Sequence, residues 1–137
     1  MSDSLLIRNA ELLVPEGDPW LGDVLVREGR IAQIGQSLSA EGVARVIDAE
    51  GHTLMPGVID PQVHFREPGR EHKEDLQTGS WACARGGVTS FLEMPNTDPL
   101  TIDQATLDDK LARAASKCVV NYGFFIGATA DNLKELQ

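Results

Sequence analysis

Through the first third of the chain, apolar residues alternate with polar ones over short runs that end at turn-forming residues, a pattern typical of β-strands. The predicted strands cover residues 5–9, 11–14 and 44–48. Residues 23–35 have the pattern of a hairpin, because two alternating apolar runs flank a Glu28-Gly29 turn. No helical period runs through this block, so residues 1–54 are predicted to form a small β module.

From residue 54 onward the pattern predicts strands that alternate with helices. The predicted strands are residues 58–65, 88–94 and 118–126, and the predicted helices are residues 73–85, a segment that follows a capping box at 101–104, and residues 131–136. Gly86-Gly87 is expected to end the first helix with a left-handed cap. Strands that alternate with helices pair in parallel through right-handed crossovers, so the fold class is predicted to be α/β.

A sheet of three parallel strands has two open edges and a small core. A closed eight-stranded barrel needs roughly 200–250 residues, and residues 55–137 provide far fewer. We therefore expect the chain to be a piece of a longer protein, ending after its third strand–helix unit. Taken alone, the piece is expected to self-associate through its unpaired edges.

Composition excludes several classes of function. The chain has 137 residues, 42% of them apolar, and a net charge of −9, which argues against binding to nucleic acids or anionic membranes. No apolar run approaches the ~18 residues of a membrane span, and the first residues do not resemble a secretory signal. Cys83 and Cys118 lack metal-site spacing and are expected to be reduced thiols in a cytoplasmic protein.

The candidate chemistry begins on the strand predicted at residues 58–65, whose two faces differ. Strict alternation gives an apolar face of Ile59, Pro61, Val63 and Phe65 and a polar face of Asp60, Gln62, His64 and Arg66. Ligands of parallel α/β proteins meet the carboxyl ends of the strands, where this polar face leads. A second histidine at position 62 would allow two imidazoles to share a metal ion, but that position is Gln62. His64 is therefore either a metal ligand or an ordinary hydrogen-bonded histidine.

Arg66 and Asn96 are the candidate substrate contacts. A guanidinium at a strand end fits the carboxylate of a small molecule, although a salt bridge to Asp60, Glu67 or another acid is an equal alternative. Asn96 follows the next strand in a turn bounded by prolines, and alone it is a typical turn-former. The carboxyl ends of the two strands are expected to meet at one edge of the sheet, the rim. If Arg66 and Asn96 both lie at this rim, together they would hold a carboxylate and an adjacent amide.

The remaining polar residues receive weaker interpretations. Asp60 would either orient a ligand or cap a turn. His72 is expected on the solvated surface before a helix, and His52 receives no role.

The series LMPGVIDPQVHFREPGREHKEDLQTGSWACARGGVTSFLEMPNT resembles the opening of a dihydroorotase, a member of the amidohydrolase superfamily. The resemblance covers essentially the whole chain, and the ordered motifs HFREPG, EHKED, GGVT and MPNT carry it. Allantoinases and dihydropyrimidinases share the opening MPG…D-x-H-x-H. They match less well, because the arginine two residues after the histidine, together with MPNT, is the dihydroorotase feature.

The resemblance implies a (β/α)8 barrel, of which residues 55–137 are the first part, and a β-sandwich to which residues 1–54 contribute. It implies one or two zinc ions (Zn²⁺), and a reaction that interconverts dihydroorotate and N-carbamoyl-L-aspartate in de novo pyrimidine biosynthesis. His64 matches the second histidine of the HxH motif, a zinc ligand. Arg66 and Asn96 match the residues that bind the substrate carboxylate, and Asp60 matches the acid that opens the motif.

Two departures from the family pattern bear on activity. Gln62 stands where the family has its first histidine, and an amide oxygen is a weak zinc ligand. The other metal ligands and the general base of the family lie on later strands, so they are expected beyond Gln137. Residues 1–137 alone are therefore expected to be inactive, with no catalytic residue among them.

Two alternatives to an active dihydroorotase stay open. They are a non-catalytic scaffold that partners aspartate carbamoyltransferase, and another cyclic-amide hydrolase such as an allantoinase. The expected partners are a small-molecule substrate and either a second copy of the protein, in a homo-oligomer, or aspartate carbamoyltransferase.

Overall fold

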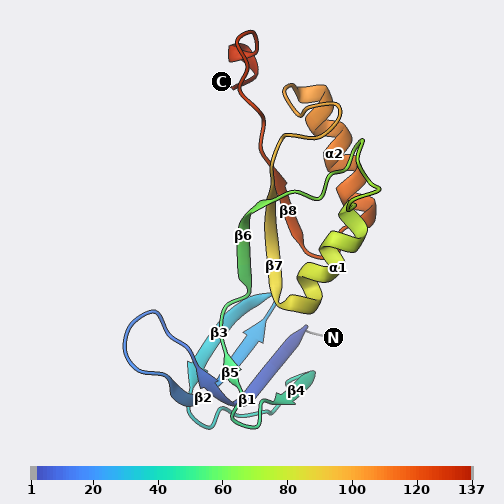
Figure 1. Cartoon of the computed structure of the whole chain (residues 1–137). Coiled ribbons are helices and arrows are strands. Elements are labelled where there is room, and N and C mark those ends of the chain that lie inside the picture. The colour runs from blue at the N-terminus through green and yellow to red at the C-terminus, as the bar shows by residue number, and fades with distance from the viewer. Residues whose placement is uncertain (1–2, 137) are drawn as a thin grey trace. The chain divides into compact units, whose positions relative to one another are not determined.

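The computed structural model describes residues 3–136, which divide into two compact units that part between Pro56 and Gly57. The first unit is a five-stranded sheet (Figure 1). Its strands are β1 (Ser4–Leu12), β2 (Trp20–Arg27), β3 (Arg30–Gly35), β4 (Arg45–Asp48) and β5 (Thr53–Leu54). The strand order is β3-β2-β1-β4, and β5 also pairs with β1. β1 and β3 run antiparallel to β2, whereas β4 and β5 run parallel to β1.

The first unit confirms the predicted hairpin and corrects the first strand. Glu28 and Gly29 have φ angles of 51° and 71°, and two positive φ angles are what a tight hairpin turn requires. The two strands predicted at residues 5–9 and 11–14 are one continuous strand with an irregularity between Ile7 and Ala10. All five strands of this unit lie in one sheet, so the second layer of a β-sandwich stays a prediction.

The second unit is a three-stranded parallel sheet with two helices on one side of it (Figure 1). Its elements in chain order are β6 (Val58–Val63), α1 (Leu76–Gly86), β7 (Val88–Glu93), α2 (Gln104–Lys117), β8 (Asn121–Phe124) and a 3₁₀ turn η1 (Leu133–Leu136). The core between sheet and helices is built on Val63, Leu76, Phe91 and Ala114. The predicted parallel alternation of strands and helices is therefore confirmed.

The beginnings of both helices differ from their predicted positions because aspartates cap them. α1 starts three residues later than predicted, since the Asp75 side chain accepts a hydrogen bond from Thr78 N–H at 2.8 Å. Its predicted glycine cap is confirmed at Gly87, where φ is 83°. The capping box of α2 is formed by Asp103 and Thr106 rather than by residues 101–104. The third strand is shorter than predicted, and the α-helix predicted at residues 131–136 is replaced by the 3₁₀ turn Leu133–Leu136.

The pairing of β6 with β7 is irregular in two places: β7 has an extra residue between Val88 and Ser90, and β6 has an extra residue between Asp60 and Val63. Asp60 pairs with Phe91 and Val63 pairs with Glu93, so a step of three residues lies opposite a step of two. Because paired residues of parallel strands point to the same face, Asp60 shares the helix-covered face with Val63. Ile59 lies on the other face and is 64% exposed. The predicted polar face is therefore wrong for Asp60, since the extra residue in β6 reverses the alternation partway along the strand.

No helix within residues 3–136 combines the length and the apolar character needed to cross a bilayer.

Candidate functional site

The structure joins His64 and Asn96 at the carboxyl ends of two adjacent strands. His64 Nδ1 lies 2.9 Å from the Oδ1 atom of Asn96. His64 follows the last residue of β6 and lies between Val63 and Phe65, which both pack into the core, so its ring faces away from the helices. Asn96 comes three residues after the end of β7, the strand parallel to β6. This contact brings His64 and Asn96 to one edge of the sheet, whereas the predicted pairing of Arg66 with Asn96 stays a prediction.

The contact favours one tautomer of the neutral histidine ring. An amide oxygen only accepts hydrogen bonds, so Nδ1 of His64 is the donor to Asn96, and in the neutral ring Nε2 then carries the lone pair. This is the form in which histidines bind metals, with the second ring nitrogen held by a polar neighbour. The side-chain nitrogen of Asn96 remains available as a donor.

The described residues supply one such ligand but not a full coordination set. Within residues 3–136, no group of three or more His, Cys, Asp or Glu side chains is arranged to hold a metal ion. Gln62 is exposed, and its backbone N–H donates to the Asp60 carboxylate at 3.0 Å. Asp60 therefore caps the irregular stretch of β6, which favours the second of its two sequence interpretations.

The resemblance to dihydroorotases implies a general base beyond Gln137, and Gln137 itself lies outside the described residues. The general base and the further metal ligands therefore stay predictions about other parts of the protein.

Arg66 lies two residues after His64 and has a left-handed backbone with φ of 64°. Its side chain is half-buried, and its carbonyl oxygen accepts a hydrogen bond from Arg70 N–H at 3.0 Å. None of the ion pairs within residues 3–136 involves Arg66. The Glu67 carboxylate, one alternative partner considered from the sequence, instead pairs with Lys117 and with Arg113.

The other two histidines lie outside this rim. His72 is exposed in the turn before α1, as predicted. The Nδ1 atom of His52 lies 2.7 Å from the carbonyl oxygen of Ala49 in the first unit.

Glu67 is a structural residue that the sequence interpretation missed. Its side chain is fully buried. The carboxylate accepts a hydrogen bond from the N–H of Leu76, the first residue of α1, at 3.1 Å. It also lies 3.5 Å from the Nη1 atom of Arg113 and in contact with the ammonium group of Lys117, both on α2. Glu67 thus connects the loop after β6 with both helices.

A second buried acid, Glu93, pairs with Lys110 beneath the rim. The Lys110 Nζ atom lies 2.9 Å from the Glu93 carboxylate, and each side chain is 1% exposed. Burial raises the pKa of Glu93, and the nearby Lys110 ammonium opposes that rise. The spacing of Leu107, Leu111 and Ala114 in the sequence predicts that Leu111 lies on the buried face of α2, but Leu111 is 39% exposed and Lys110 is buried instead. The pattern could not reveal this pair, because it scores a lysine as a surface residue.

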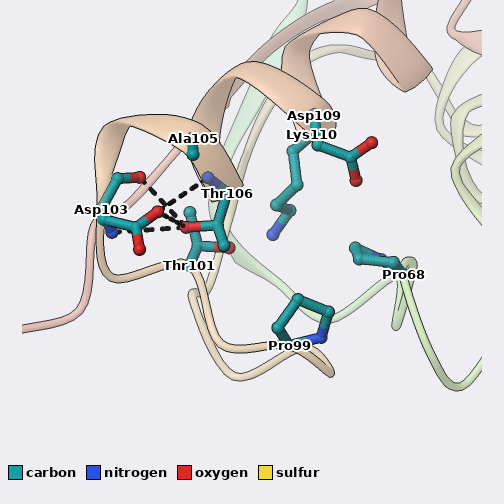
Figure 2. A pocket seen from close by; sticks show the side chains of 8 residues that line it. All are labelled: Pro68, Pro99, Thr101, Asp103, Ala105, Thr106, Asp109 and Lys110. Atoms are coloured by element: carbon teal, nitrogen blue, oxygen red, sulfur yellow. Dashed lines mark hydrogen bonds between the residues drawn. The ribbon is translucent and has the colours of Figure 1, made fainter.

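A pocket of about 210 Å³ lies beside Lys110. It is lined by Pro68, Pro99, Thr101, Asp103, Ala105, Thr106, Asp109 and Lys110. Figure 2 shows the Lys110 side chain extending from α2 into this pocket, toward the loops that carry Pro68 and Pro99. Neither His64 nor Asn96 lines it, so the pocket lies apart from the rim that they form.

The chain belongs to the amidohydrolase family, whose sequence profile matches residues 53–136. Among curated relatives, a dihydroorotase of Bacillus cytotoxicus is 43% identical over 85% of this chain and 27% of its own length. An allantoinase of Enterococcus faecalis is 41% identical over 98% of this chain and 30% of its own length. The chain thus spans less than a third of the length of these relatives.

Solved structures show the same relationship in three dimensions. The L-hydantoinase (dihydropyrimidinase) of Arthrobacter aurescens matches with a TM-score of 0.91 at 30% identity, over 99% of this chain and 30% of that one. A dihydroorotase crystal structure matches with a TM-score of 0.59 at 19% identity, over 90% of this chain and 31% of that one, and this likeness concerns the fold alone. The mixed α/β fold is therefore shared with hydantoinases.

Proposed function

We propose that this chain is part of a zinc-dependent dihydroorotase, which interconverts dihydroorotate and N-carbamoyl-L-aspartate in pyrimidine biosynthesis. The observation that carries the proposal is the 2.9 Å contact between His64 and Asn96, with Arg66 two residues further along the same rim. The family membership and the 43% identity to a dihydroorotase support it.

The rim residues have separate roles in this proposal. His64 would hold zinc through Nε2, while the side-chain oxygen of Asn96 accepts a hydrogen bond from Nδ1 and orients the ring. Arg66 binds the substrate carboxylate through its two-pronged guanidinium, assisted by the side-chain N–H₂ of Asn96. Zinc, when bound, lowers the pKa of a water molecule and polarises the carbonyl group under attack. The general base and further metal ligands come from parts of the protein beyond Gln137.

The proposal includes the larger architecture. Residues 55–137 are the first three strand–helix units of a (β/α)8 barrel, and residues 1–54 belong to a β-sandwich. The parallel β6-β7-β8 sheet and the likeness to hydantoinase structures support the barrel. We also propose a cytoplasmic location, a small-molecule substrate and assembly as a homo-oligomer or with aspartate carbamoyltransferase. Two free cysteines, Cys83 and Cys118, support the location.

The test compares a substrate that carries a carboxylate with one that lacks it. In the protein at its natural full length, Arg66→Ala is expected to lower kcat/KM for dihydroorotate about 10- to 150-fold, equivalent to ~1.5–3 kcal/mol for a charged hydrogen bond. Hydrolysis of hydantoin, which has no carboxylate, should change little. Arg70→Ala, an exposed arginine of the same loop, is the matched control. Equal losses on both substrates would refute the role of Arg66.

An allantoinase is the second candidate, favoured by the 41% identity to one. The natural protein would then hydrolyse allantoin, a neutral hydantoin, faster than dihydroorotate, and Arg66→Ala would leave that rate intact.

Gln62 favours a third candidate, a scaffold subunit without activity. Gln62→His separates this case from an enzyme with an altered site. A gain of bound zinc together with new activity would identify the natural protein as a scaffold. High activity in the natural protein, unchanged by the substitution, would identify an enzyme.

A further inference from the structure

The buried Glu93–Lys110 pair reaches the ends of all three strands of the second unit. Glu93 is the last residue of β7, and it pairs in register with Val63, the last residue of β6. The Lys110 ammonium lies 3.4 Å from the carbonyl oxygen of Met94 and 4.8 Å from the ring centre of Phe124, the last residue of β8. One lysine of α2 therefore contacts the point at which two neighbouring strands pass into their loops.

The same pair acts on the backbone that carries the candidate substrate contacts. Burial raises the pKa of Glu93, and the Lys110 ammonium and the nearby backbone N–H groups of Phe65 and Arg66 oppose that rise. Within residues 3–136, neither carboxylate oxygen of Glu93 has an aligned hydrogen-bond donor. Charge and peptide dipoles, rather than well-formed hydrogen bonds, therefore hold this group between α2 and the start of the loop after β6.

Such an arrangement is a poor source of stability. Replacing a buried ion pair by apolar side chains of similar volume is often neutral or stabilising, because burial removes the hydration of both charges. The position of the pair suggests a different use. Glu93 pairs in register with Val63, three residues before Arg66, and it lies three residues before Asn96. The left-handed backbone of Arg66 is unusual for a residue with a side chain.

We infer that Glu93 and Lys110 are positioning residues, which hold the backbone of Arg66 and the β7–α2 loop so that Arg66 and Asn96 meet the carboxylate of the substrate. This inference rests on the proposed function, because it deepens the roles given there to Arg66 and Asn96. According to this inference, the geometry of the substrate-binding rim depends on a buried pair that does not itself contact the substrate.

The experiment uses the full-length protein with the double variant Glu93→Leu/Lys110→Met. Removing both charges keeps the core filled and avoids leaving one buried charge without its partner. The variant is expected to fold with near-natural stability, and to lose at least about tenfold in kcat/KM for dihydroorotate, since small misplacements of binding groups have large effects on rate. The loss should fall mainly on KM, and hydantoin hydrolysis should be largely retained. Asp109→Asn, the neighbouring residue on α2 with an exposed charge, is the control and should change neither rate.

A readout independent of activity separates this inference from the proposed function. Amide hydrogen exchange, followed by mass spectrometry, should become faster in the peptide containing residues 64–67 of the double variant, and stay unchanged in the β1–β2 sheet. Unchanged exchange at residues 64–67, or equal losses on both substrates, would overturn the positioning role. A natural protein inactive on dihydroorotate, whose double variant still exchanges faster at residues 64–67, would refute the proposed function while leaving the positioning of the Arg66 backbone in place.

Discussion

Substitution of Glu67 offers a strong test of how the loop after β6 is held in place. In Glu67→Ala, the N–H of Leu76 at the start of α1 loses its acceptor, and Lys117 and Arg113 lose their buried counter-charge. A hydrogen bond to a charged group contributes ~1.5–3 kcal/mol. Each ion pair adds only about 0.5 kcal/mol, because the side chains of Arg113 and Lys117 are 38% and 37% exposed and solvent screens them.

The expected loss for Glu67→Ala is therefore ~2.5–4 kcal/mol in the free energy of unfolding. Glu67→Gln keeps an acceptor for Leu76 N–H and loses only the charge, so its expected cost is about 1–2 kcal/mol. The matched control is Asp109→Ala. It removes an exposed pair with Arg113 at 2.7 Å, which is expected to contribute only ~0.3–0.5 kcal/mol.

The assay is urea unfolding of the full-length variants. Their free energies of unfolding are compared between variants that have the same m-value. Hydrogen exchange at Leu76 provides a local check, since only Glu67→Ala frees that amide. The reasoning is refuted if Glu67→Ala destabilises the protein no more than Asp109→Ala does. A loss confined to Glu67→Gln would contradict it equally, because the smaller change would then have the larger effect.

Two further predictions concern α1. Hydrogen bonds from the Thr78 N–H and hydroxyl hold the pKa of Asp75 below its ordinary value of about 3.9, so this cap stabilises the fold above that pH and loses its effect as pH falls through the lower folded value. Asp75→Asn keeps the cap without the charge, and urea unfolding at pH 7 and pH 3 should show a smaller loss on acidification than the natural protein; identical losses would contradict this. Gly79→Ala would place a methyl group 2.7–2.9 Å from the Phe65 ring, and the expected cost is ~1–3 kcal/mol. Gly86→Ala, in open space on the same helix, should be neutral or stabilising, and thermal unfolding of the two variants compares them.

Local signals in the sequence predicted several features of the fold and site. The Glu28-Gly29 turn and the Gly87 cap depend on the backbone preferences of one or two residues, so the sequence suffices to find them. The contact between His64 and Asn96 was foreseeable because both residues follow parallel strands, whose carboxyl ends meet at one edge.

The features that the sequence did not reveal depend on partners distant in the chain. The burial of Lys110 requires Glu93 on another element, and hydrophobic periodicity contains no information on such pairing. The extra residue in β6 is visible only against the register of β7. Glu67 stood beside Arg66 in the sequence, yet its charge partners come from α2, about fifty residues further along the chain.

The extra residue in β6 has a consequence for protein engineering. Before the extra residue, the odd-numbered Ile59 faces away from the helices, and after it the odd-numbered Val63 faces toward them. The positions that tolerate polar substitutions therefore differ between the two halves of the strand. A one-residue insertion or deletion elsewhere in the strand would shift the pairing by one residue and exchange the inward- and outward-facing positions on one side of the change. Libraries that vary this strand should therefore conserve its length before its composition.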